Sequence, residues 1–317
     1  MAPLVYYPDD QPGIRRQKRG RGFSYLAPDG TTIDDKAERT RLAAMAVPPA
    51  YVDVWMCPLA HGHLQATGRD DRQRKQYRYH PDWTAAQAQV KFEKLIDFGH
   101  ALPRIRRTVR RHLSEDAGEK TFALASAVAM IDRLSLRVGH DSYTRENGSY
   151  GALTLRRRHV KLAEGKIALN YVAKGGKRVR RQLADRTLSR ILNKIGDLPG
   201  ATLLSWLDDQ GAPQTLSSEA LNSYIADSAG GAFTAKTFRT WAGTLAAFEV
   251  AAEGPVTIKA MSDAAAARLH NTPTIARNSY IHPDVIALSE GDVTLAEGPK
   301  TADLRQAERR LLAYLER

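Results

Sequence analysis

The 317-residue sequence predicts an α+β fold, with a small β-rich region followed by a larger, mostly helical one. Before residue 82, apolar and polar residues alternate with a period of two, which is typical of half-buried strands. His80-Pro81 interrupts this pattern, and from Trp83 the apolar residues recur with helical spacing. A second period-two stretch at 150–184 predicts a small antiparallel sheet inside the helical region. We therefore expect two domains, residues 1–82 and 83–317.

The composition is that of a folded, basic protein. Apolar residues make up 43% of the chain, and 47 Lys and Arg against 35 Asp and Glu give a net charge of +12. A surface with this charge attracts polyanions, although an excess of basic residues can also do no more than confer solubility. Cys57 is the only cysteine, which excludes an intrachain disulfide and a cysteine-based zinc site. With no signal peptide or membrane-spanning run in view, we expect a cytoplasmic, nucleoid-associated protein that contacts no membrane.

The first 60 residues contain four predicted features. Residues 15–21 carry five cations in seven positions, and residues 22–33 alternate around Asp29-Gly30, a pair typical of a tight hairpin. The acidic pair at 34–35 favours the start of a helix. Residues 51–56 alternate as a strand.

Basic and aromatic residues interleave at the end of the β-rich region. If this segment is a strand, its two tyrosines lie on one face. It then suits a DNA groove, with cations on phosphates and polar groups on base edges. An equally favoured alternative is a solvated edge strand whose tyrosines cover a small core. The candidate DNA-binding residues here are Arg72, Arg74, Lys75, Gln76, Tyr77 and Tyr79.

Three helical stretches follow, at 85–98, 102–113 and 119–138. The second contains five arginines, for most of which we expect a solvated helix face and for some a phosphate contact. They are Arg104, Arg106, Arg107, Arg110 and Arg111. The third is the clearest helix in the chain, and Gly139 suits a left-handed cap at its end. Arg137, just before that cap, is a candidate anion ligand, although an arginine in this position more often binds carbonyls of its own last turn.

The period-two stretch predicts strands at 152–155, 159–162, 166–172 and 178–183. Its last turn has Lys174 and Lys177 flanking Gly-Gly, a sequence that favours a hairpin. A lysine at such a tip is usually a solubilising charge, but it is also a compact proton donor on a mobile loop.

The chain returns to helices beyond residue 199, with predictions at 217–229, 234–252, 257–269 and 303–315. On the second, Lys236 and Arg239 are neighbours on a face away from an apolar stripe. The stretch at 269–280 ends in Tyr280. A tyrosine hydroxyl attacks phosphorus only where cations stabilise the phenolate and the charge on the phosphoryl oxygens, so this residue requires arginine and lysine partners.

In combination, the motifs resemble those of the type IB DNA topoisomerases, particularly the small poxvirus-like and bacterial members. The resemblance covers most of the chain. It rests on Gly-Arg-Asp at 68–70 with the run at 75–80, Leu-Arg-Val-Gly at 136–139 with residues 146–151, Val-Ala-Lys at 172–174, Lys-Thr-Phe-Arg at 236–239, and the stretch 272–280.

The resemblance implies a two-lobed clamp around double-stranded DNA, with a three-stranded sheet in the larger lobe. It implies that Tyr280 attacks a phosphodiester to form a 3′-phosphotyrosyl link, after which the duplex swivels and the 5′-hydroxyl attacks back. Arg137 and Arg239 would bind the phosphoryl oxygens, Lys174 would protonate the leaving oxygen, and Asn271 would donate a hydrogen bond.

The same resemblance implies a monomer that uses no ATP, nucleotide cofactor or metal ion. It also adds His140, Tyr143 and Lys236 to the candidate DNA contacts. Asn271 departs from the histidine of poxviral members and cannot become cationic.

Two alternatives stay open. A tyrosine recombinase shares the arginine, lysine and tyrosine chemistry, but such enzymes usually carry His-x-x-Arg where this chain has Lys236. The other is a basic DNA-binding protein that has lost catalysis, which the presence of all five catalytic candidates disfavours.

Overall fold

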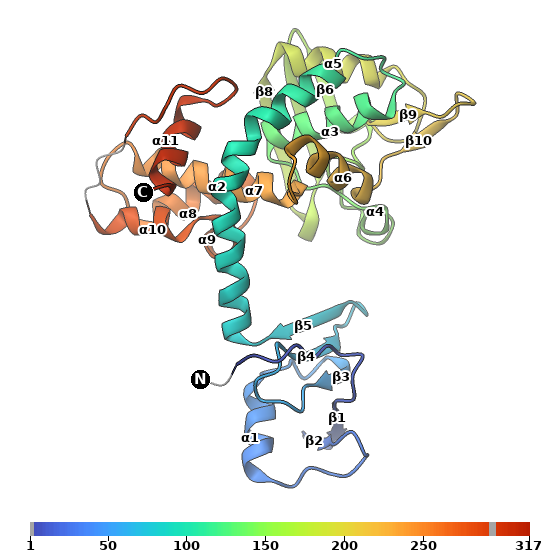
Figure 1. The fold of residues 1–317 in the computed structure, drawn as a ribbon. Helices are drawn as coiled ribbons and strands as arrows, with labels where there is room; N and C mark the ends of the chain where they lie inside the picture. The colour runs from blue at the N-terminus through green and yellow to red at the C-terminus, as the bar shows by residue number, and fades with distance from the viewer. Residues whose placement is uncertain (1–2, 292–295) are drawn as a thin grey trace. The chain divides into compact units, whose positions relative to one another are not determined.

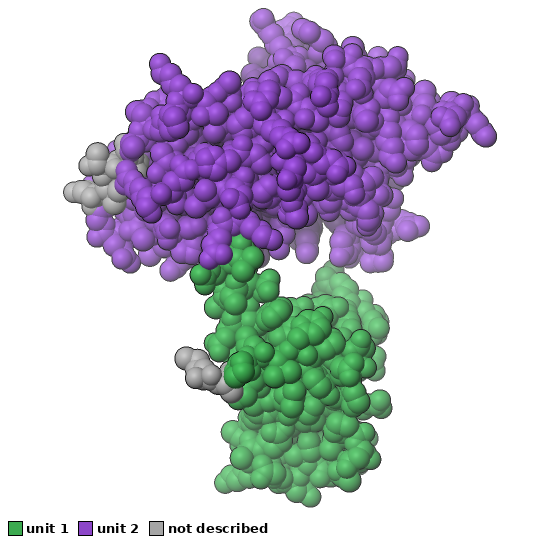
Figure 2. Space-filling model, in the orientation of Figure 1, with its two compact units in different colours: residues 1–91 green, residues 92–317 purple. Residues whose placement is uncertain are grey.

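A computed structural model describes residues 3–291 and 296–317. The chain divides into two compact units, residues 1–91 and 92–317, which Figure 2 colours separately. Helix α2 (Pro81–His112) begins in the first unit and ends in the second. The predicted domain boundary at residue 82 falls at the start of this helix and stays a prediction.

The described part of the first unit contains a five-stranded antiparallel sheet, one complete helix and the first residues of α2. The strand order is β2-β1-β3-β4-β5, which leaves β5 at an edge. Helix α1 (Lys36–Ala44) begins where the acidic pair predicts, with the Asp35 side chain accepting from Glu38 N. The core includes Ile14, Leu42 and Met56. The strands are β1 (Ile14–Arg19), β2 (Gly22–Leu26), β3 (Val52–Met56), β4 (Leu64–Arg69) and β5 (Lys75–Tyr79).

The predicted turn at Asp29-Gly30 forms, but a longer hairpin that was not predicted precedes it. The cationic run is itself strand β1, which turns at Gly20 and pairs with β2. Gly30 has a φ of +87° and lies in a second turn, which is closed by an antiparallel bridge between Leu26 and Thr32 and by hydrogen bonds from Ala27 N to Thr31 O and from Ile33 N to Tyr25 O. The cations fit a strand because Arg16 donates to three backbone oxygens of the loop before β3, those of Val47, Pro48 and Tyr51.

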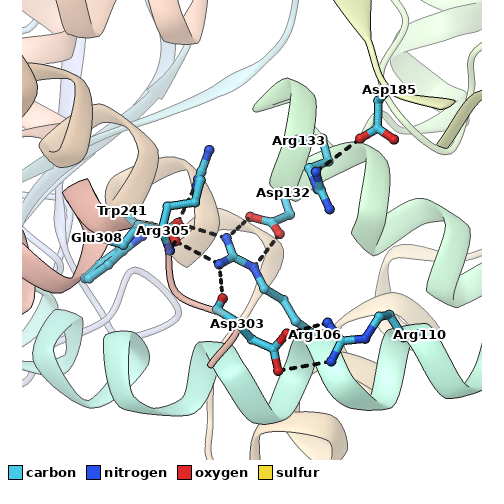
Figure 3. A network of polar contacts seen from close by, with 9 residues as sticks. All are labelled: Arg106, Arg110, Asp132, Arg133, Asp185, Trp241, Asp303, Arg305 and Glu308. Carbon is cyan, nitrogen blue, oxygen red and sulfur yellow. Dashed lines mark hydrogen bonds and ion pairs between the residues drawn. The ribbon is translucent and has the colours of Figure 1, made fainter. Parts of the chain in front are cut away.

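Helix α2 replaces the two helical stretches predicted at 85–98 and 102–113, with Pro103 inside it. One of its arginines was assigned wrongly. Arg106 is neither solvated nor free for phosphate, because it pairs with Asp132 of α3 and Glu308 of α11 (Figure 3). Burial alone would raise the pKa of Glu308, but hydrogen bonds from Arg106 and Arg305 outweigh it and lower the pKa to about 2. This network fixes the C-terminal helix on the second unit.

Helix α3 (Lys120–Leu134) ends four residues earlier than predicted. The left-handed cap is Ser135, with φ 53°, and not Gly139. Gly139 does have a positive φ of +85°, but it lies in the loop that follows. Arg137 therefore belongs to an irregular segment and not to a helix end.

The sheet of the second unit has three antiparallel strands in the order β6-β7-β8. They are β6 (Val160–Ala163), β7 (Lys166–Val172) and β8 (Arg178–Ala184). The predicted strand at 152–155 is instead a buried turn. Helix α5 (Arg186–Gly196) and the short pair β9 (Ser205–Leu207) and β10 (Pro213–Thr215) follow. With this sheet set among helices, the predicted α+β fold class is confirmed.

The C-terminal helices agree closely with the prediction. Helix α7 packs against α8, and α9 packs against both (Figure 1). Ser217 and Thr257 cap α6 and α8 by accepting from backbone N–H groups three residues on. The remaining helices are α4 (Asp141–Asn147), α6 (Ser218–Ala229), α7 (Ala235–Ala251), α8 (Ile258–Leu269), α9 (Pro273–Tyr280), α10 (Pro283–Ala287) and α11 (Gln306–Leu315).

Candidate functional site

The candidate site is built on the C-terminal ends of two helices. Helix α3 ends at Leu134 and α8 ends at Leu269, and in each the next residue is left-handed: Ser135 with φ 53° and His270 with φ 51°. A left-handed residue turns the chain sharply away from the helix axis. Both helix ends therefore lead directly into segments that carry predicted catalytic residues.

Those two segments meet, because the Arg137 guanidinium donates to the Asn271 amide oxygen. Close backbone packing fixes the Arg137 segment, with Ala152 N donating to Arg137 O at 2.8 Å. A Cβ on Gly151 would lie 2.6 Å from that same oxygen, so only glycine fits there. Arg137 and Asn271, 134 residues apart in the chain, thus form one unit.

Arg239 is the buried cation of the site, with 5% of its surface exposed. It donates to the carbonyl oxygens of Ser135 and Leu269, the latter at 3.0 Å, so it bridges the two helix ends. Burial and, next, the charge of Arg137 lower its pKa to about 10, which leaves it cationic at neutral pH. The sequence predicted Arg239 on a face away from the apolar stripe, and the structure buries that position too, because α7 is buried around most of its circumference there.

Tyr280 lies at the end of α9, with the Arg239 Cζ 5.4 Å from the centre of its ring. Its backbone is anchored on α7, where the Thr244 hydroxyl donates to Tyr280 O at 3.1 Å. A Cβ on Gly243 would lie 2.8 Å from Tyr280 O and 2.9 Å from Tyr280 Cβ. The glycine thus allows the tyrosine backbone to approach the helix that carries Arg239.

The site is rich in positive charge. Among the described residues, no carboxylate forms an ion pair with Arg137 or Arg239, and Arg239 Nε and Asn271 Nδ2 are buried without a hydrogen-bond partner. Burial and, next, the charges of Arg181 and Arg239 lower the pKa of His270. Buried donors without acceptors are costly in a folded protein. Their grouping indicates a site for an anion.

Lys174 is not brought into this cluster. It lies exposed at the turn between β7 and β8, and no hydrogen bond or ion pair joins its ammonium to the described part of the chain. The charge of Lys177, at the other side of the same turn, does reach His270. The hairpin therefore lies beside the cluster, with Lys174 at its exposed tip.

The DNA-binding candidates of the first unit lie on the edge strand β5 and the turn before it. Tyr77 and Tyr79 are 49% and 46% exposed and stack with ring centres 6.1 Å apart, so they do not cover a core. Three of the polar candidates already have acidic partners: Lys75 pairs with Asp9, and Arg74 and Gln76 bind Asp70. Arg72 is exposed.

The candidates of the second unit lie on its surface. His140 caps α4, and its ring meets that of Tyr143 edge to face at 6.0 Å. Tyr143 is 50% exposed. Lys236 is exposed in the first turn of α7.

Sequence reasoning missed Arg181, which lies on β8 and donates to the carbonyl oxygens of Leu134 and Arg268. One signal was available. In β8, Arg181 occupies the same face as Val179 and Leu183, and a cation on the inward face of a strand is unusual. It also missed Tyr171, a buried tyrosine whose pKa burial raises while the charge of Arg137 opposes that shift.

Within residues 3–291 and 296–317, no group of three or more His, Cys, Asp or Glu side chains gathers as a metal ion would require. In the same part of the chain, no helix combines the length and apolar character needed to cross a bilayer.

A tyrosine beside buried, unbalanced guanidinium groups is an arrangement suited to phosphoryl chemistry. Comparisons with known proteins agree. The family model described as the eukaryotic DNA topoisomerase I catalytic core matches residues 80–272, and that of the bacterial DNA topoisomerase IB N-terminal domain matches residues 22–70. The chain belongs to the type IB DNA topoisomerase family.

Individual relatives support this assignment. A DNA topoisomerase 1B of Acanthamoeba polyphaga mimivirus is 30% identical over 237 residues, which is 74% of this chain and 70% of the relative. The DNA topoisomerase 1B of Vaccinia virus (strain Copenhagen) is 23% identical over 39% of each chain. A solved XerH site-specific recombinase bound to its difH substrate aligns with a TM-score of 0.39 and 16% identity, covering 60% of this chain and 51% of that one. That last likeness is too low to bear on function.

Proposed function

We propose that this enzyme relaxes supercoiled duplex DNA by cutting one strand, letting the duplex swivel and resealing the strand. The observation that carries the proposal is the position of Arg239, a buried cation that lies over the Tyr280 ring and has an unpartnered Nε. A fixed positive charge there can stabilise the negative charge that develops when the tyrosine oxygen attacks a phosphate. Tyr280, which the motif at 272–280 identified as the candidate nucleophile, therefore also lies beside the proposed anion site.

In the proposed reaction the Tyr280 oxygen attacks a phosphorus of the DNA backbone. The new O–P bond forms as the bond to the 5′ oxygen breaks, which leaves a 3′-phosphotyrosyl link. Negative charge gathers on the non-bridging oxygens, where Arg137, Arg239 Nε and Asn271 Nδ2 supply donors. Because the carbonyls of two helix ends already hold Arg239, its donors need little reorganisation.

Lys174 would give a proton to the departing 5′ oxygen, since an alkoxide is too basic to leave unaided. Its exposed position at the tip of the β7–β8 turn suits a group that reaches the site only when DNA is bound. Two glycines with φ of +78° and +74° follow it, which gives this tip unusual backbone freedom. Resealing reverses the step, with the 5′-hydroxyl attacking the phosphotyrosine.

Both units would contact the same duplex. The stacked, half-exposed pair Tyr77 and Tyr79 offers an aromatic surface on β5, and His140, Tyr143 and Lys236 offer contacts on the second unit. The bond energy kept in the phosphotyrosine makes ATP unnecessary. We also propose that the enzyme acts as a monomer, without a metal ion, on the nucleoid.

The test is relaxation of supercoiled plasmid in EDTA without ATP. We expect the wild-type protein to relax the plasmid, and Tyr280→Phe to bind DNA normally yet relax none of it. Lys174→Ala should cleave slowly and recover when the 5′ leaving group is made more acidic. Normal relaxation by Tyr280→Phe contradicts the proposal, and strand exchange between paired sites would point to a recombinase.

A further inference from the structure

Two arginines, and not one, join the helix ends that carry the candidate site. Arg239 donates to the carbonyl oxygens of Ser135 and Leu269. Arg181 donates from a single nitrogen to those of Leu134 and Arg268, at 2.9 Å each. The two side chains, from α7 and β8, therefore bind adjacent carbonyls at the end of α3 and adjacent carbonyls at the end of α8.

The partners of Arg181 explain why a cation is stable at this place. The last four carbonyls of a helix lack partners within it and carry the negative end of the helix dipole. Arg181 lies where two such ends meet, although no carboxylate among the described residues pairs with it. Burial and, next, the charge of Arg268 lower its pKa, and the hydrogen bonds to the two helix-end carbonyls are interactions that favour the cation.

We propose that Arg181 is a positioning residue for DNA cleavage, which holds the ends of α3 and α8 together so that Arg137 and Asn271 meet. The proposal rests on the function proposed above. Leu134 lies three residues before Arg137, and Arg268 lies three residues before Asn271. Without the bridge, the two segments lose the hydrogen bonds that tie them to Arg181 of β8, and we expect the Arg137–Asn271 contact to loosen.

Arg181→Met removes the bridge and keeps an unbranched apolar side chain of similar length. A misplacement of about 1 Å at a reacting group can cost about 100-fold in rate. We therefore expect single-turnover cleavage to slow by about 10- to 100-fold. Arg180→Met is the matched control, because Arg180 is the exposed neighbour on the same strand and its loss changes the net charge equally. We expect it to cleave at nearly the wild-type rate.

A double-mutant cycle separates positioning from a general loss of folding. If Arg181 acts through Arg137, Arg181→Met should slow the wild-type enzyme strongly but add little in an Arg137→Ala background. In a Lys174→Ala background, where Arg137 is intact, the loss should persist in full. If Arg181 had only a structural role, Arg181→Met would reduce the cleavage rate by the same factor in the Arg137→Ala and Lys174→Ala backgrounds.

The outcomes are distinguishable from failure of the proposed function. If the wild-type protein forms no Tyr280 adduct with DNA, the function itself fails. If it does, and Arg181→Met either cleaves at the wild-type rate or slows both backgrounds alike, the positioning role is wrong. Should Arg181→Met not fold, Arg181→Lys takes its place in the same cycle, because it keeps the cation on a shorter side chain. We expect it to lose less of the cleavage rate, with the same dependence of that loss on Arg137.

Discussion

Gly243→Ala is predicted to slow DNA cleavage far more than it destabilises the fold. The added Cβ would lie 2.8 Å from Leu269 Cδ1, 2.8 Å from Tyr280 O and 2.9 Å from Tyr280 Cβ. Relaxed carbon contacts are about 3.5–4.0 Å, so α9 must move by roughly 1 Å. Because two of the three contacts are with the backbone and Cβ of the tyrosine, no side-chain rotation relieves them.

The magnitudes decide which effect dominates. Alanine in a helix interior is favoured over glycine by about 1 kcal/mol, while overpacking costs about 1–3 kcal/mol, so the net loss of stability is at most about 2 kcal/mol. A 1 Å displacement of the nucleophile, in contrast, can cost about 100-fold in rate. We expect a folded protein that cleaves roughly 100-fold more slowly.

The assay is single-turnover cleavage of a DNA oligonucleotide, read beside thermal unfolding, with two glycine controls. Gly196→Ala, at the end of α5, meets no atom within 4 Å and should be silent. Gly99→Ala meets Leu312 and Trp241 side chains at 2.8 and 2.9 Å, which is similar crowding away from Tyr280. It should lose stability with little loss of rate. Equal rates for Gly243→Ala and wild type, or an equal rate loss in Gly99→Ala, would refute the reasoning.

Four further results are expected. Glu308→Gln should lower the free energy of unfolding by about 3–5 kcal/mol in urea titrations, because two arginines lose their shared buried carboxylate. As a control, Asp263→Asn, which removes the exposed ion pair with Lys259, should lower it by under about 0.5 kcal/mol. Asn271→Asp should cleave more slowly than Asn271→Ala, since a carboxylate would neutralise Arg137 and repel phosphate; faster cleavage would be contrary evidence. The pKa of His270 is lower in the folded protein than in the unfolded chain, so the free energy of unfolding should decrease as the pH falls below about 6.5. His270→Asn should flatten the dependence of the free energy of unfolding on pH in that range. Activity should not fall as pH rises through that range; a steep fall that His270→Ala abolishes would transfer the role of Asn271 to His270.

The sequence predicted best those elements whose limits are set locally. Helices α6 and α8 begin one residue after Ser217 and Thr257, whose side chains cap the adjacent N–H groups. The motif residues Arg137, Asn271, Arg239 and Tyr280 do gather in one place, although their roles stay predictions. Chain motifs therefore selected residues that the fold brings together, and their identity as a site stays a prediction.

Errors arose where distant partners decide the structure. The end of α3 was misplaced because Leu136 continues the apolar pattern, whereas the chain breaks at Ser135, whose carbonyl binds Arg239 from 104 residues away. Arg106 resembled a solvated cation because its partners, Asp132 and Glu308, lie 26 and 202 residues along the chain. Nothing in a local window carries that information.

The central claim is that guanidinium groups from separate parts of the chain activate one tyrosine toward a DNA phosphate. Its most direct measurement is mass spectrometry of the peptide left attached to DNA when cleavage is trapped on a substrate that cannot be resealed. The predicted product is the peptide containing Tyr280, joined through its phenolic oxygen to a 3′-phosphate, with a free 5′-hydroxyl on the other strand end. An adduct at another residue, or one joined to the 5′ end, would contradict the account.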